Sequence, residues 1–217
     1  MRISSVDQYL QLDPCQLAST VISCPFCGRD HGIPYREIQS GRGVLHELPD
    51  VMRRCLGHAP TCVGLIYDRH IENLIETFVL PAIPSSIRLL RYPLGQKNHL
   101  LEAEDTLGRA AAACIDSSVE ILIGAGSGVI CDLTKLISDI VNRPSIICGT
   151  ALSMNAYTSN TAVITENNFK LSKFVRVSDA VILDSLLLAT APDEMTLAGL
   201  GALSARAICN ADFRLSP

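Results

Sequence analysis

A glycine- and serine-rich loop between two apolar segments is the part of the sequence best suited to chemistry. The stretch VEILIGAGSGVICDLTKL, residues 119–136, passes from an apolar run through Gly-Ala-Gly-Ser-Gly into a segment with helical spacing. Gly126 and Gly128 lack a Cβ, so their main-chain amides can approach a phosphate at the start of the predicted helix. Asp132 can accept bonds from first-turn amides or hold the loop in shape. A bare strand-to-helix turn is the alternative, because the loop is neither G-x-G-x-x-G nor a Walker A sequence.

Polar side chains also follow other apolar segments. Asp68 follows the apolar run at 61–67, where its carboxylate can accept bonds from an adenosine ribose or cap a helix predicted from Arg69; both roles stay open. The stretch GTALSMNAYTSN, residues 149–160, follows the run at 145–149. Because the carboxyl ends of parallel strands meet at one edge of a sheet, these loops predict a dinucleotide cradle. The candidate polar residues of the last loop are Thr150, Ser153, Asn155, Tyr157, Thr158 and Ser159.

The stretch CPFCGRDH places Cys24, Cys27 and His31 close together in the sequence. These residues are part of a zinc knuckle, which needs a fourth ligand, or they belong to a turn held by Pro25 and Gly28. The nine cysteines are odd in number and scattered, and several lie in apolar segments. We therefore expect them to be reduced and mostly buried.

The elements that must position these loops follow from the apolar pattern. Apolar runs at 61–67, 119–126 and 145–149 predict buried strands, a further short strand is predicted at 86–92, and these strands alternate with helical patterns. One such helix follows the Gly41–Gly43 turn, with Val44, Leu45, Leu48 and Met52 on one face, and another is predicted at 103–114. This alternation predicts an α/β fold with a parallel, Rossmann-like nucleotide-binding sheet covered on both faces.

Composition excludes several classes of function. The chain has 217 residues and a formal net charge of -4, without the basic stripe that a nucleic-acid partner requires. Its apolar stretches are shorter than the roughly 20 residues that cross a bilayer, and Arg2 is followed by no secretory apolar region. We therefore expect a cytoplasmic protein with neither a nucleic-acid nor a membrane partner.

Several blocks together resemble one known family. They read IQSGRGVLHELP, IGAGSGVICDLTK, TALSMNAYTSNTAVI, AVILDSLLLATAPDEMTLAGLG and CNADFRL, and they run in order from about residue 24 to the C-terminus. The chain resembles the sn-glycerol-1-phosphate dehydrogenases of the iron-containing alcohol dehydrogenase and dehydroquinate-synthase-like superfamily. The resemblance implies that NAD or NADP binds in the α/β domain and that zinc and substrate bind against a helical domain. The implied reaction interconverts dihydroxyacetone phosphate and sn-glycerol 1-phosphate.

The resemblance also implies site residues and domain limits. It assigns substrate contact to Asn155 and divides the chain into an N-terminal extension at 1–37, an NAD(P)-binding domain at 38–185 and the start of a helical domain at 186–217. It favours a homodimer or association with an intact paralogue. The implied cofactor-binding residues are Asp68, Gly126, Gly128, Val129, Ile130, Cys131, Asp132, Thr150, Ala151, Leu152, Ser153 and Ser159.

The sequence departs from the family where the metal should bind. Ala202 stands where the family motif A-G-x-G-D has its metal-binding aspartate, and no histidine follows His99. The expected zinc ligands are therefore missing, and the catalytic residues are unknown. Tyr157 is interpreted as a packing residue and Lys170 as a solvated loop charge. The alternative to a dehydrogenase is a catalytically impaired nucleotide-binding paralogue, or a partner subunit.

Overall fold

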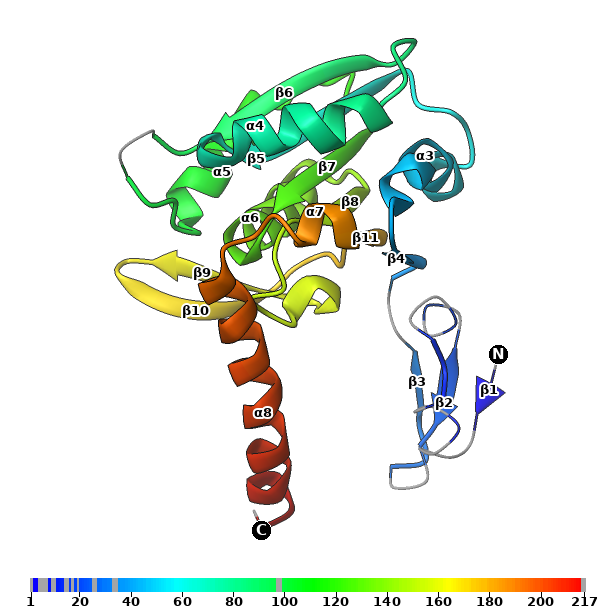
Figure 1. Cartoon of the computed structure of the whole chain (residues 1–217), viewed down its shortest axis with the longest axis vertical. Helices are drawn as coiled ribbons and strands as arrows, with labels where there is room; N and C mark the ends of the chain where they lie inside the picture. The colour runs from blue at the N-terminus through cyan, green and yellow to red at the C-terminus, as the bar shows by residue number, and fades with distance from the viewer. Residues whose placement is uncertain are drawn as a thin grey trace.

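A six-stranded parallel sheet forms the centre of the protein (Figure 1). The computed structural model describes residues 2–3, 8, 11–13, 16, 18, 20–24, 27–32, 35–96 and 99–215; Cys15 and Pro25 lie outside them. All strand pairs in this sheet are parallel, which confirms the predicted α/β fold. From edge to edge the strands are β4 (Glu37–Gly41), β11 (Ala180–Asp184), β8 (Ser145–Gly149), β7 (Ile121–Gly126), β5 (Cys62–Asp68) and β6 (Arg88–Leu94).

The central strands are apolar throughout because both faces of the sheet are covered. Every residue of β7 and β8 is buried. One face packs against η1 (Val44–Glu47) and α3 (Leu48–Leu56), while the other packs against α6 (Gly128–Val141). Alternate residues of each strand therefore enter two different clusters, as a doubly covered sheet requires.

The strand order creates a change of direction between β5 and β7. The chain moves outward from β5 to β6, then returns past β5 to form β7 on its other side, and continues to β8. The two central strands pair directly, with Tyr67 in register with Ala125. Asp68 and Gly126 come next on their strands, so they end neighbouring strands at the point where ligands of such sheets settle.

The segment after Asp68 corrects one prediction. A regular helix was expected from Arg69, but the chain instead forms η2 (Arg69–Ile71), α4 (Glu72–Leu74), the π-helical η3 (Ile75–Val79) and η4 (Leu80–Ala82). Ile75 and Val79 are buried against the sheet, so the apolar face survives although the helical repeat changes. Pro81 has no amide hydrogen to donate, which is consistent with a short 3-10 turn at the end of this segment.

The next helix, α5 (Asp105–Cys114), confirms the helical pattern expected at 103–114.

Two further elements frame the carboxyl edge of the sheet. The strands β9 (Thr161–Glu166) and β10 (Phe169–Phe174) form an antiparallel hairpin, and its two-residue turn has positive φ at Asn167 and Asn168. After β11, the short α7 (Ser185–Leu188) leads to the long α8 (Asp193–Leu215), which projects away from the sheet in Figure 1. Among the described residues, no helix combines the length and apolarity needed to cross a membrane.

A separate small sheet precedes β4. It consists of β1 (Arg2–Ile3), β2 (Val21–Ser23) and β3 (Asp30–Gly32), with β2 and β3 antiparallel. No cysteine in the described part of the chain is in a disulfide. Only half of these cysteines are buried, so the expectation that most thiols are buried was wrong. The buried ones are Cys55, Cys62, Cys131 and Cys148, and the exposed ones are Cys27, Cys114 and Cys209.

Candidate functional site

The start of α6 opens onto a cavity at the carboxyl edge of the sheet. Ser127 precedes the helix, and its side chain makes no capping hydrogen bond, so it leaves first-turn amides available to a ligand. Next to this helix end lies a cavity of about 440 Å³. Its lining comes from α6, from the loop before α5 and from the β9–β10 hairpin, and comprises Leu100, Leu101, Glu102, Ala103, Gly128, Val129, Asp132, Val163, Thr165 and Lys170.

Gly126 and Gly128 have different roles in the structure of the loop. A Cβ on Gly126 would lie 2.5 Å from the Cβ of Ile130, so this glycine lets α6 pack closely on β7. A Cβ on Gly128 would meet only Met154, at an ordinary contact distance of 3.6 Å. Gly128 lines the cavity, whereas Gly126, Ile130 and Cys131 are buried. The part of the loop that faces the cavity therefore begins at Gly128. Gly126 is instead needed for the close packing of α6 on β7.

Asp132 is the cavity residue with the most unusual environment. Its Oδ1 atom is buried, has no hydrogen-bond partner and lies 3.8 Å from the Nζ atom of Lys135. Burial raises the pKa of the Asp132 carboxyl above its ordinary value, against the opposing effect of the Lys135 charge. The thiol of neighbouring Cys131 has its pKa raised to about 12 by burial, so it is not a reactive nucleophile.

Lys135 is a residue that the sequence analysis did not single out. It is fully buried, and its Nζ atom donates to the carbonyl oxygens of Ala156 (2.8 Å) and Thr161 (3.1 Å) and to Oγ of Ser159 (3.1 Å). Its position three residues after Asp132 on the same predicted helix is a signal that could have identified it. These bonds fix the loop after β8 to α6.

The loop after β8 presents fewer groups than its composition suggested. Thr150 and Ala151 are buried, while Leu152 is 49% exposed and Ser153 is half-buried. The Ser159 hydroxyl is engaged within the protein: it accepts from Lys135 and lies within hydrogen-bond distance of two main-chain carbonyls.

Two other residues of this loop have clear positions. Tyr157 is buried, its hydroxyl donates to the Ala151 carbonyl at 2.6 Å, and burial raises its pKa, which confirms its interpretation as a packing residue. Asn155, the residue implied for substrate contact, is exposed. Lys170, interpreted as a solvated charge, is exposed on β10 but also lines the cavity.

Asp68 caps the segment that follows β5. Its Oδ1 atom accepts from the main-chain nitrogen of His70 at 2.9 Å and lies 2.8 Å from Nδ1 of the same histidine. The capping role left open by the sequence is therefore present. Gly95 lies beside this carboxylate, since a Cβ there would be 3.6 Å from Asp68 Oδ1. Asp68 thus lies next to the loop that follows β6.

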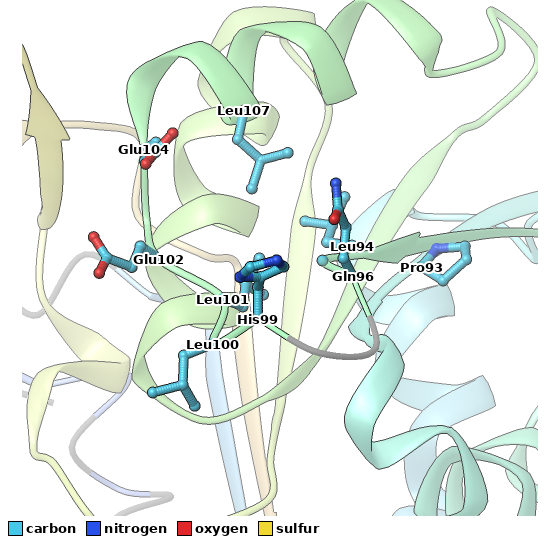
Figure 2. A pocket seen from close by; sticks show the side chains of 10 residues that line it. Pro93, Leu94, Gln96, His99, Leu100, Leu101, Glu102, Glu104 and Leu107 are labelled. Carbon is cyan, nitrogen blue, oxygen red and sulfur yellow. The ribbon is translucent and has the colours of Figure 1, made fainter.

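That loop borders a second, larger cavity of about 740 Å³, shown in Figure 2. Figure 2 shows His99 and Leu101 close together among the lining residues, with Gln96 beside Leu94 on one side and Leu107 of α5 on another. Leu100, Leu101 and Glu102 line both this cavity and the one at α6. The two cavities therefore adjoin across a wall formed by these residues, which the sequence analysis did not identify.

The described residues around the two cavities include no cluster of metal-ligating side chains. Among the described residues, the group of three or more cysteine, histidine or carboxylate side chains close enough to share an ion is Cys24, Cys27 and His31, before the sheet. Ala202 lies half-buried on α8 and offers no ligand atom. The residues described around the two cavities therefore do not fit the catalytic metal that the resemblance implies.

Comparison with known proteins places the chain in a family. Residues 39–192 match the model of the iron-containing alcohol dehydrogenases. Among curated proteins, the chain is 29% identical over 187 residues to a glycerol-1-phosphate dehydrogenase [NAD(P)+] of Methanosarcina barkeri, covering 83% of this chain and 49% of that protein. It is 25% identical over 195 residues to the enzyme of the same name from Halalkalibacterium halodurans, covering 88% and 48%. The chain thus spans about half the length of these relatives.

Solved structures show the same fold at lower identity. A probable glycerol dehydrogenase from Sinorhizobium meliloti superposes with a TM-score of 0.64 at 20% identity, covering 77% of this chain and 44% of that one. Glycerol dehydrogenase from Schizosaccharomyces pombe gives a TM-score of 0.62 at 20% identity, covering 76% and 41%. The family match extends over well more than half of the sequence, from β4 to the turn before α8. The chain therefore belongs to the iron-containing alcohol dehydrogenase family.

Proposed function

We propose that this chain forms the NAD(P)-binding half of an oxidoreductase of the glycerol-1-phosphate dehydrogenase type. The observation that carries the proposal is the start of α6, which has no side-chain cap, follows the strand at the change of direction in the sheet and opens onto the smaller of two adjoining cavities. A helix N-terminus in this position favours an anion through its free amides and its dipole.

The residues present fit a dinucleotide. We assign the pyrophosphate to the amides of Gly128 to Ile130, and the adenosine to the larger cavity beside Asp68. Asp132 Oδ1, buried without a hydrogen-bond partner, is an acceptor for a hydroxyl of the ligand. The loop from Thr150 to Ser153 lies after the neighbouring strand β8 and faces the remaining part of the cofactor. Bound nicotinamide supplies the hydride donor or acceptor.

The role of the chain's own residues is binding and orientation. Lys135 holds the loop that carries Ser153 and Asn155 against α6, so the cofactor and substrate contacts are fixed relative to one another. Asn155 contributes a neutral amide to the phosphorylated substrate. The described residues do not supply metal ligands at this site, so we derive no metal-assisted step from them. The names of the relatives point to glycerol 1-phosphate as one substrate, and the family resemblance implies dihydroxyacetone phosphate as its oxidised counterpart.

A second candidate function is that of a partner to an intact family member. It is favoured by α8, where Leu197, Leu200, Leu203 and Ile208 are each between 58% and 67% exposed. Apolar side chains at this spacing on one helix form a surface that a neighbouring subunit, of this chain or of a paralogue, can cover. Such a partner also supplies the metal ligands that the described residues around the two cavities lack.

Titration of the purified chain with NADH and NADPH, followed by nicotinamide fluorescence, tests the binding function. A Gly128→Glu variant adds a negative charge at the proposed phosphate site, and its Cβ meets only Met154. We expect it to weaken binding by about tenfold or more, which corresponds to about 1.4 kcal/mol. The matched control is Gly201→Glu, since nothing lies within 4 Å of a Cβ there. Absence of binding by the wild-type chain at about millimolar cofactor overturns the proposal.

Turnover separates the two candidate functions. Reduction of dihydroxyacetone phosphate is measured with zinc added, first with the chain alone and then with an intact family member. Clear turnover by the chain alone shows that Ala202 is compatible with catalysis. Binding without turnover, together with complex formation through α8, favours the partner function.

A further inference from the structure

We propose that Cys24, Cys27 and His31 bind a zinc ion that holds the β2–β3 hairpin together. This site is separate from the dinucleotide cradle and from the metal position implied by the family. The ligand atoms of all three residues lie within 4.8 Å of one another. Cys27 Sγ and His31 Nε2 are 3.0 Å apart.

The hairpin brings these side chains together through its main chain. The amide of Cys24 donates to the carbonyl of Arg29 at 2.9 Å, and the amide of Gly28 donates to the carbonyl of Cys24 at 3.0 Å. Gly28 has φ of 67°, a left-handed conformation that favours glycine. The expected turn at Gly28 is therefore present. This turn is compatible with metal binding, because it brings the three candidate ligands together.

The distances suit a tetrahedral zinc ion. With Zn–S bonds of about 2.3 Å and Zn–N bonds of about 2.0 Å, tetrahedral ligand atoms lie about 3.5 to 3.8 Å apart. The Cys27–His31 separation of 3.0 Å is somewhat shorter than this and no separation exceeds 4.8 Å, so small side-chain rotations suffice to enclose an ion. Two thiolates and a neutral imidazole also balance the charge of Zn²⁺, and soft sulfur ligands select zinc over the oxygen-binding cations.

The packing of this region gives an independent reason for a metal. Between residues 8 and 32, Thr20 is the one described residue that is buried. The strands β2 and β3 have three residues each, too short to be stable without a core. A small unit with so little apolar burial requires a cross-link such as a bound metal ion. Metal binding then contributes directly to its folding free energy.

The position of the hairpin, away from the proposed cofactor site, indicates a structural role for the ion. Residue 36 joins it to β4, where the Arg36 amide donates to the Asp179 carbonyl at 2.8 Å. This is the amino-terminal edge of the sheet, because Glu37 is the first residue of β4 and pairs with Ala180, the first residue of β11. The cradle at Gly128 lies at the opposite, carboxyl edge. Figure 1 shows β2 and β3 apart from α6 and β7.

Three protein ligands leave one coordination position of a four-coordinate zinc ion, which a water molecule can occupy.

Metal content of the purified full chain is the first test. We expect about one zinc per chain, lost in Cys24→Ser, Cys27→Ser and His31→Ala. Matched controls at exposed positions, Cys114→Ser and His58→Ala, keep the metal. Substoichiometric zinc in the wild type, or zinc retained in the Cys27→Ser variant, overturns the proposal.

A second measurement avoids substitutions that disturb folding. Wild-type protein is alkylated with and without a chelator, and modified cysteines are identified by mass spectrometry. Cys24 and Cys27 are expected to be protected until the chelator is added, whereas the exposed Cys114 and Cys209 react in both conditions. Equal reactivity with and without chelator, or a Cys24–Cys27 disulfide in protein kept under reducing conditions, overturns the site. Replacement by Co²⁺ should add a thiolate-to-metal charge-transfer band.

Discussion

The Nζ atom of Lys135 lies 3.1 Å from Oγ of Ser159, and this bond joins α6 to the loop that follows β8. Lys135 is fully buried and also donates to the carbonyls of Ala156 and Thr161. A single ammonium group therefore satisfies polar atoms of a loop that has little regular structure. The proposed cofactor and substrate contacts depend on this arrangement.

Replacement of Lys135 by methionine should destabilise the protein. The variant leaves the Ala156 and Thr161 carbonyls without their donor and leaves the Asp132 carboxylate buried without its nearest cation. Breaking a buried charged arrangement by removing one partner typically costs about 3 to 5 kcal/mol. Urea unfolding measures the loss. Lys170→Met is the matched control, because Lys170 is exposed, and we expect it to change the unfolding free energy by less than about 0.5 kcal/mol.

Replacement of Asp132 by asparagine should change stability in a pH-dependent way. Burial raises the pKa of Asp132 in the folded state, so as pH rises the unfolded chain loses its proton first. The wild type therefore loses stability as pH rises through this raised pKa, and asparagine does not. The unfolding free energy of Asp132→Asn relative to wild type should increase as pH rises from the ordinary carboxyl value of 3.8 through the raised pKa of the folded state. A difference that decreases over this interval contradicts the raised pKa.

The two glycines of the phosphate loop should respond differently to alanine. Gly126→Ala places a methyl group 2.5 Å from the Ile130 Cβ, and overpacking of this kind costs about 1 to 3 kcal/mol. Gly128→Ala meets only Met154 at 3.6 Å and should be close to neutral for stability. Thermal unfolding of both variants makes the comparison. Equal destabilisation would show that α6 does not pack on β7 as described.

The glycines of α8 provide a similar pair. A Cβ on Gly199 would overlap the carbonyl oxygen of Leu152, whereas a Cβ on Gly201 meets nothing within 4 Å. Gly199→Ala should separate the start of α8 from the loop after β8. Gly201→Ala should stabilise the helix by about 1 kcal/mol through backbone propensity. Hydrogen exchange of α8 amides, faster in the first variant and slower in the second, tests the contact.

The strands at 121–126 and 145–149 were predictable because burial on both faces leaves a continuous apolar run. The β9–β10 hairpin was missed although its signal is present, since Asn167-Asn168 is a two-residue turn with positive φ at both positions. The helix expected after Asp68 proved irregular, because packing of Ile75 and Val79 on the sheet decides its local repeat.

The sequence by itself determined the fold class and the location of the glycine loop, because both depend on local composition and periodicity. The family resemblance came from the sequence too, through the wording and order of its motif blocks. Only the tertiary structure decided that Gly126 is needed for Ile130, that Lys135 holds the loop after β8, and that Asp68 and Gly126 end adjacent strands. These contacts form only when the strands are arranged in their final order in the sheet. Strand order is fixed by long-range packing, which leaves no periodic signal in the chain.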